Sequence, residues 1–145
     1  MLLLDTNVVS ELRKVRAGKA DPNVAKWAQN TNTNDLYISV ITLQELEIGV
    51  LWMLRRDEMQ GQLLRRWLDA HVLPAFSGRI LSIDTQIAQC AAALHAPNPN
   101  SLPIRDGLIA ATALIHNMCV VTRNVRDFEA SGVAIINPWK SENLS

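Results

Sequence analysis

The 145-residue chain has no excess of charge of either sign, because 14 Lys and Arg residues balance 14 Asp and Glu residues. The formal net charge of zero excludes a bulk electrostatic attraction to nucleic acid, so such binding would need a local basic patch or metal-assisted contacts. Cysteine is scarce as well. Cys90 and Cys119 lie in apolar segments without a CxxC pattern, so the sequence gives no indication of a zinc site, and we expect both to be small buried side chains.

Long hydrophobic runs are also absent. No apolar stretch approaches the roughly 18 residues that cross a membrane. No basic segment precedes Met1–Leu4, and Asp5 interrupts the run, so the start does not resemble a signal peptide. We therefore expect a cytoplasmic protein without membrane contact. The length predicts a single domain, residues 1–145, which is large enough to fold without disulfides or a structural metal.

Short apolar runs alternate along the chain with longer segments of helical periodicity. Strands are predicted at Leu2–Leu4, Leu36–Val40, Arg79–Ile83, Cys119–Thr122 and Val133–Ile136. Helical patterns follow the first strand and cover Leu43–Leu54, Leu63–Val72, Ile87–Leu94 and Ile104–Asn117, and we expect Pro74 to end the second of these four. This alternation predicts right-handed βαβ units, hence an α/β fold with a mainly parallel five-stranded sheet and helices on both faces.

The first strand ends in a carboxylate. Asp5 follows Leu2–Leu4 directly, and Thr6 and Asn7 come next, before a helical pattern begins. This order places Asp5 at the carboxyl edge of the sheet, where open α/β folds bind ligands. A charge so close to an apolar core is costly unless another group pairs with it. Asp5 could alternatively cap the helix that follows.

Further polar residues have positions that can converge at the same edge. Glu45 is expected in the first turn of the helix after the second strand, and Asp106 near the start of the helix at Ile104–Asn117, while Asn124 and Asp127 follow the fourth strand. If the carboxylates converge there, they repel, and one pair about 4 Å apart costs about 4 kcal/mol at an effective dielectric constant near 20. A divalent cation removes this conflict, and oxygen ligands of this kind suit Mg²⁺ or Mn²⁺ rather than zinc. Acidic clusters with such ions are widely used to hydrolyse phosphodiesters.

Each of these acids also has an ordinary structural explanation. Thr42-Leu-Gln-Glu45 fits a capping box, in which Glu45 would only close a helix terminus. Asp106 lies in a predicted first turn, where any acid complements the helix dipole. Asp127 could be a common turn residue. The spacing alone leaves both interpretations open.

Five segments in order along the chain carry a resemblance to a known family. They are Leu3–Glu11, Ile38–Gly49, Arg105–Ala113, Val121–Phe128 and Asn137–Trp139. With these segments the chain resembles the PIN-domain family, and within it the VapC and FitB-like toxins of bacterial type II toxin–antitoxin pairs. The resemblance implies a three-layer α/β/α PIN fold and a metal-dependent endoribonuclease that cleaves RNA. It also implies partners: a VapB-like, DNA-binding antitoxin that holds the enzyme inactive, a homodimer, and a larger complex with the antitoxin.

The resemblance also assigns roles to single residues. Asp5, Glu45 and Asp106 match the acidic triad of the family, which is both catalytic and metal-binding. Asn124 stands where many members have a fourth acid, so a second ion would bind weakly unless the nearby Asp127 compensates. Other residues match positions close to the metal: Thr6, Asn7 and Thr122.

Three arginines flank the predicted acids: Arg105, Arg123 and Arg126. They are candidates for contacts with RNA phosphates. A solvated surface with a few ion pairs explains them equally well.

Several other functions are consistent with an α/β chain of this size. A PIN-fold nuclease in RNA processing and a catalytically weakened PIN scaffold both remain alternatives, the second because of Asn124. A response-regulator receiver would need a second acid two residues after Asp5, where Asn7 stands. A dinucleotide-binding protein would need G-x-G-x-x-G after the first strand, which is missing.

Overall fold

The computed structural model describes residues 1–140, and the last five residues of the predicted domain, 141–145, lie outside the described part. Its five short strands are β1 (Leu2–Leu4), β2 (Leu36–Ser39), β3 (Ile80–Leu81), β4 (Cys119–Val121) and β5 (Ile135–Ile136). They form one sheet in the order β3-β2-β1-β4-β5, and every pairing is parallel. The predicted five-stranded parallel sheet is therefore confirmed, although β3 and β5 are shorter than expected.

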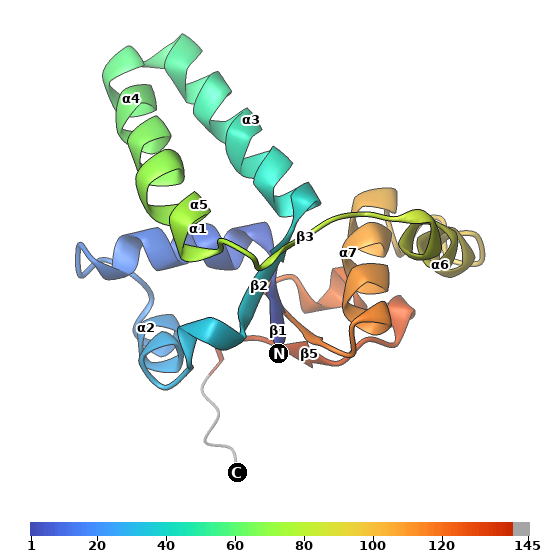
Figure 1. The fold of residues 1–145 in the computed structure, drawn as a ribbon. Helices are drawn as coiled ribbons and strands as arrows, with labels where there is room; N and C mark the ends of the chain where they lie inside the picture. The colour runs from blue at the N-terminus through green and yellow to red at the C-terminus, as the bar shows by residue number, and fades with distance from the viewer. Residues whose placement is uncertain (141–145) are drawn as a thin grey trace.

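Helices cover both faces of this sheet. The α-helices are α1 (Thr6–Val15), α2 (Pro22–Gln29), α3 (Val40–Arg56), α4 (Glu58–Trp67), α5 (Leu73–Ala75), α6 (Thr85–His95) and α7 (Ile104–Ile115). The short turns are η1 (Thr33–Asp35), the π-helical η2 (Leu68–Val72), η3 (Val125–Asp127) and η4 (Glu129–Ser131). Figure 1 shows α1 and α2 on one side of the sheet and α6 and α7 on the other, which confirms the α/β/α architecture.

The hydrophobic core lies on both faces of the central strand β1. Successive side chains of a strand point to opposite faces, so Leu4 packs among residues of α1, α3 and η2, whereas Leu3 packs against α7. Both leucines are fully buried. Because both faces of β1 are covered, the strand reads as an unbroken apolar run, and the first polar residue after it marks the edge of the core.

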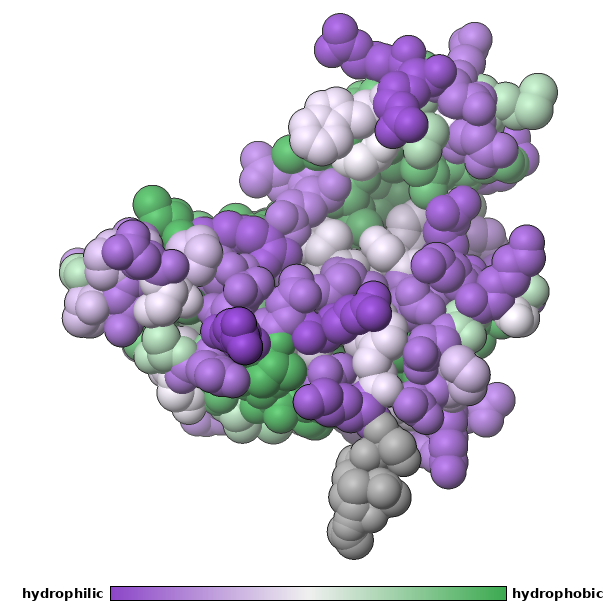
Figure 2. Space-filling model, turned by 180° about the vertical axis from the view of Figure 1, so that it is seen from behind, coloured by the Kyte–Doolittle hydropathy of each residue, from purple (hydrophilic) through white to green (hydrophobic). Residues whose placement is uncertain are grey.

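Helices α3 and α4 form a hairpin that stands out from the body of the molecule (Figure 1). Asp57 ends α3 and caps α4, with its carboxylate accepting a hydrogen bond from the Gln60 backbone N–H at 3.1 Å. The hairpin exposes several large hydrophobic side chains, among them Trp52, which is 67% exposed. The face seen in Figure 2 is mainly hydrophilic, with smaller hydrophobic groups on the hairpin and on the body.

Two details of the helices differ from the sequence-based expectations. Pro74 does not end the helix that contains Trp67, because the chain continues through η2 into α5, which includes Pro74. The π-turn gives the Leu73 N–H a bond to the Leu68 carbonyl and so widens the helix before the proline ring, which cannot fit a regular α-turn. Helix α2 was not anticipated, although Asp21 and Pro22 are a typical cap and first residue.

None of the helices within residues 1–140 combines the length and apolar character that a bilayer crossing requires.

Candidate active site

Asp5 lies where β1 gives way to α1, and its side chain is only 1% exposed. Its backbone N–H continues the β1–β4 ladder to the Val121 carbonyl at 2.9 Å. The carboxylate accepts hydrogen bonds from the Thr6 backbone N–H and the Thr122 hydroxyl, both at 2.8 Å. Asp5 therefore does cap α1, as one interpretation held, but it also has partners from distant parts of the chain that capping does not require.

Glu45 extends from α3 toward Asp5. The helix begins at Val40, and the Ser39 hydroxyl caps it by accepting a hydrogen bond from the Ile41 backbone N–H at 3.0 Å. Glu45 is therefore in the second turn and not at a helix terminus, so the capping-box interpretation of Thr42-Leu-Gln-Glu45 is wrong. Its carboxylate instead accepts a hydrogen bond from the Thr6 hydroxyl.

Asp106 completes the group from the first turn of α7. The helix begins after Pro103, which offers no side-chain cap, so an acid at this end also complements the helix dipole. The side chain is nevertheless buried and bonded to a neighbouring cation, which a simple dipole interaction would not require. The three carboxylates of the predicted triad thus come from β1, α3 and α7 to one place.

Arg105 lies at the centre of these three carboxylates. Its Nη2 donates to Asp5 Oδ1 and Glu45 Oε1, both at 2.6 Å, and its Nε donates to Glu45 Oε2 at 2.6 Å. Its Nη1 bonds Asp106 Oδ1, and Nη2 also reaches the Thr6 hydroxyl at 3.2 Å. The sequence had suggested Arg105 only as a phosphate contact or a surface ion pair, whereas in the structure it joins the acids to one another.

The ionisation of the site follows from burial and from this guanidinium. Burial opposes the charge of Glu45, but hydrogen bonds from Arg105 and Thr6 hold its pKa below the ordinary value. Burial raises the pKa of Asp106, and the nearby charges of Asp127 and Asp5 add to this, while Arg105 opposes it. Burial also disfavours the charge of Arg105, yet the bonds to Glu45 and the charge of Asp5 raise its pKa.

The remaining predicted residues surround Asp5 on the β4 side. The Asn7 amide donates to Asp5 Oδ2 at 3.2 Å and lies 3.4 Å from the Thr122 hydroxyl. That hydroxyl accepts the Asn124 backbone N–H at 2.9 Å. Asn124 thus contacts the site through its backbone, and Asp127, on η3, is close enough for its charge to affect Asp106.

The other two predicted arginines lie outside the carboxylate group. Arg123 is exposed, and its guanidinium stacks over the Trp139 ring with 5.3 Å between the guanidinium carbon and the ring centroid. Arg126 is exposed on η3, the turn that also carries Asp127. Their contact with RNA stays a prediction.

The donor chemistry of the site is that of a hard cation. Carboxylates, hydroxyls and an amide are ligands for Mg²⁺ or Mn²⁺, and no thiol or imidazole is among them. Among the residues that the structure describes, no set of three or more His, Cys, Asp or Glu side chains is already arranged around a metal position. Nor does any buried side-chain nitrogen or oxygen in residues 1–140 lack a hydrogen-bond partner. The residues therefore fit such an ion by type, while Arg105 now binds their oxygens.

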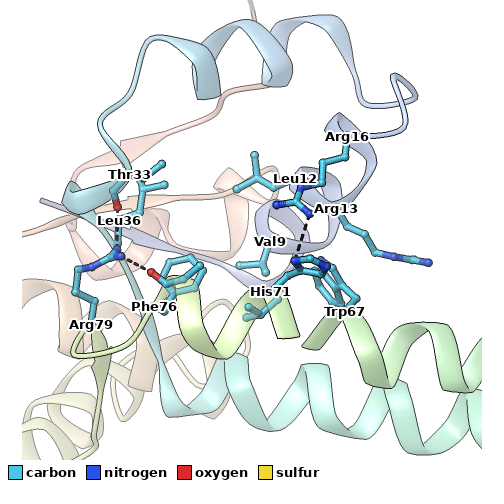
Figure 3. A pocket seen from close by; sticks show the side chains of 12 residues that line it. Val9, Leu12, Arg13, Arg16, Thr33, Leu36, Trp67, His71, Phe76 and Arg79 are labelled. Atoms are coloured by element: carbon cyan, nitrogen blue, oxygen red, sulfur yellow. Dashed lines mark hydrogen bonds between the residues drawn. The ribbon is translucent and has the colours of Figure 1, made fainter. Parts of the chain in front are cut away.

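A separate cavity of about 470 Å³ lies between α1, β2 and the segment from Trp67 to Arg79. Its floor is apolar, with Val9 and Leu36 among the lining residues. Arg16 and His71 meet at 3.2 Å on one side, and Arg79 bonds backbone carbonyls on the other (Figure 3). None of the predicted site residues lines this cavity. The segments that form its walls lie far apart in the sequence, and no local motif predicts that they meet.

Taken together, the fold and the site define a parallel α/β protein with an acidic, oxygen-lined cluster at the carboxyl edge of its sheet. The chain belongs to the PIN domain family, which its sequence matches over residues 2–132. The family predicted from the sequence is thereby confirmed.

Its relatives include named toxins and ribonucleases. The chain is 40% identical to VapC ribonuclease Y4jK of Sinorhizobium fredii, over 97% of this chain and 99% of the relative. It is 36% identical to Toxin FitB of Neisseria gonorrhoeae, over 96% and 99% of the two chains. Among solved structures, FitAcB from Neisseria gonorrhoeae superposes with a TM-score of 0.87 at 35% identity and covers 97% of this chain and 100% of that one. DNA-bound VapBC from Salmonella typhimurium gives a TM-score of 0.68 at 26% identity, over 96% and 98%.

Proposed function

We propose that this protein is the toxin of a type II toxin–antitoxin pair and acts as an endoribonuclease that depends on Mg²⁺ or Mn²⁺. The observation that carries this proposal is the convergence of Asp5, Glu45 and Asp106 from three separate elements at one edge of the sheet. The names of the relatives support this, because VapC ribonuclease Y4jK is a ribonuclease by name and FitB a toxin by name, and each matches nearly the whole chain.

The carboxylates would hold the cation, with Asp5 and Asp106 as the principal ligands and Glu45 as a further one. When bound, such an ion activates water for attack on phosphorus and stabilises the charge on the phosphate oxygens. The chain supplies the orientation: the Thr122 hydroxyl and the Asn7 amide both bond Asp5 Oδ2 and so fix the plane of that carboxylate. A ligand held in this way loses little conformational entropy when it binds.

The number of metal ions that the site holds depends on the residues near Asn124. An amide there gives no charge, but Asp127 lies within electrostatic reach of Asp106. We expect one strongly held ion at the triad and, if a second binds, a weaker one on the Asp127 side.

The partner would be a DNA-binding antitoxin that inhibits the nuclease. Solved relatives support this, since FitAB was solved bound to a DNA fragment and VapBC from Salmonella typhimurium was solved bound to DNA. We expect the toxin to be a homodimer within a larger complex with the antitoxin.

The test is cleavage of a fluorogenic RNA by the purified protein. Activity should require Mg²⁺ or Mn²⁺ and disappear in excess EDTA. Asp5→Asn and Asp106→Asn should each abolish cleavage, since each removes a ligand charge. Asp35→Asn is the matched control, because Asp35 is exposed on η1 and away from the site. Cleavage at the wild-type rate by Asp5→Asn, or undiminished activity in EDTA, would contradict the proposal.

A further inference from the structure

An ordinary ion pair joins one cation to one carboxylate, whereas Arg105 contacts all three carboxylates of the acidic triad. One guanidinium bonds both oxygens of Glu45, one oxygen of Asp5 and one oxygen of Asp106. Charge-assisted, multidentate contacts of this kind are among the strongest hydrogen bonds in proteins. The guanidinium therefore occupies the oxygens through which the three acids face one another.

Few carboxylate oxygens of the triad are left over for another cation. Asp5 Oδ2 already accepts hydrogen bonds from Thr122 and Asn7, and both Glu45 oxygens are bound by Arg105. A cation that binds all three acids must therefore use oxygens that Arg105 now holds. Retaining the guanidinium beside it would place two positive groups in contact in a partly buried site, which is electrostatically unfavourable.

We propose that Arg105 is the internal counter-ion of the metal-free site, and that metal binding displaces its guanidinium from the carboxylates. The proposal rests on the metal site of the proposed function. Three carboxylates and one guanidinium leave a formal charge of −2, so the fold can bring the acids together before any metal arrives. The same contacts oppose the metal, because they must break when it binds.

The position of Arg105 gives it a route out of the cluster. Its side chain is 33% exposed, whereas that of Asp5 is 1% exposed, so the guanidinium lies between the buried carboxylates and solvent. Because it lies in the first turn of α7 and has a long, flexible side chain, it can swing outward by side-chain rotation while Asp106, the next residue, stays in place. A displaced Arg105 would then lie at the rim, where an RNA phosphate would meet it.

The direct test is calorimetric titration of the full-length protein with Mn²⁺, without RNA. Arg105→Gln should bind Mn²⁺ at least about tenfold more tightly than the wild type, because no guanidinium has to leave. The matched control is Arg65→Gln. Arg65 also forms a bidentate pair with a glutamate, Glu47, but on the α3–α4 hairpin, so its loss should leave Mn²⁺ affinity unchanged. Equal or weaker Mn²⁺ binding by Arg105→Gln would overturn the proposal.

A second measurement uses the wild type and so does not depend on the folding of the variant. In EDTA, the Arg105 Nε–H is bonded to Glu45 and should give a protected nitrogen-15 NMR signal, identified by its absence in Arg105→Lys. Addition of Mg²⁺ should cause the loss of this signal through exchange with water. A signal that persists at saturating Mg²⁺ would show that the guanidinium stays in place and would overturn the displacement.

These readouts separate the two proposals. If the wild type binds Mn²⁺ and cleaves RNA while Arg105→Gln binds no more tightly, the counter-ion proposal fails and the proposed nuclease stands. If neither protein binds Mn²⁺ at millimolar concentration, the metal-dependent function fails, and the counter-ion proposal fails with it.

Discussion

The α3–α4 hairpin depends on a glycine at the point where its helices cross. A Cβ atom placed on Gly61 would lie 2.5 Å from Leu54 Cα and 2.6 Å from Leu54 N and Cδ2. Two of these three atoms belong to the backbone of α3, so no side-chain rotation can relieve the contact, and α4 must move away. Overpacking of this kind costs up to about 3 kcal/mol, and the better helix propensity of alanine returns about 1 kcal/mol. We therefore expect Gly61→Ala to lower the free energy of unfolding by about 2 kcal/mol.

Gly49 provides the matched control for this substitution. It lies on the same hairpin, in α3, and a Cβ there would meet nothing within 4 Å. Gly49→Ala should therefore stabilise the protein by up to about 1 kcal/mol through helix propensity alone. Urea denaturation followed by tryptophan fluorescence and by circular dichroism measures both values. A Gly61→Ala variant as stable as Gly49→Ala would refute the argument that the two helices are in backbone contact at Gly61.

Four further predictions concern the ionisation of two acids, a buried hydroxyl and assembly. In EDTA at pH 7, Glu45→Gln should lower the midpoint of unfolding. The pKa of Glu45 lies below its ordinary value of 4.5, so the charge of Glu45 stabilises the fold above that pH. The difference between the variant and the wild type should therefore shrink as the pH falls below 4.5. Asp106→Asn should leave the midpoint of unfolding unchanged or raise it, because the pKa of Asp106 is raised and its charge therefore disfavours folding at pH 7. A decrease of the midpoint as large as that of Glu45→Gln would contradict this. Thr122→Val should lower the free energy of unfolding, measured by urea denaturation, by about 1–3 kcal/mol, because Asp5 Oδ2 and the Asn124 N–H lose their bond to that hydroxyl. Unchanged stability would contradict the assigned bonds. Light scattering at micromolar concentration should give the mass of a homodimer, and a monomer would contradict the expected assembly.

The strands and the acids could be predicted because their signals are local. A run of three leucines followed by Asp5 identifies both a buried strand and its carboxyl end, and the structure has β1 at Leu2–Leu4 as predicted. The approach of Glu45 to Asp5 followed from one topological rule, that parallel strands end at a common edge, whereas Asp106 lies at the start of α7, which follows α6 rather than a strand. The short extent of β5 could not be predicted, since the apolar residues Val133 and Ala134 precede its hydrogen-bonded ladder, and at β3 the apolar Ile83 lies two residues beyond the strand.

The role of Arg105 could not be read from its neighbours. Adjacent helical residues do not face each other, so the Arg105-Asp106 pair gives no local reason to expect a shared cluster. Its main partners, Asp5 and Glu45, lie 100 and 60 residues away in the sequence, and only the folded topology brings them to it. A buried site of three acids does require a compensating charge, but the sequence pattern does not indicate that an arginine of the same chain provides it.

Because β1 is the central strand of the sheet, the order in which the chain is synthesised determines when the site can form. Asp5 is made among the first residues, but Arg105 and Thr122, which bond its two oxygens, follow 100 and 117 residues later. The strand β4 that flanks β1 is likewise made late, whereas β2 is made early. A nascent chain that stops before Arg105 therefore has the first acid with its local partners Thr6 and Asn7, but without the bonds from Arg105 and Thr122. Activity built on this site would therefore arise only after β4 has been made and has paired with β1, so the order of synthesis delays the site until both halves of the sheet are present.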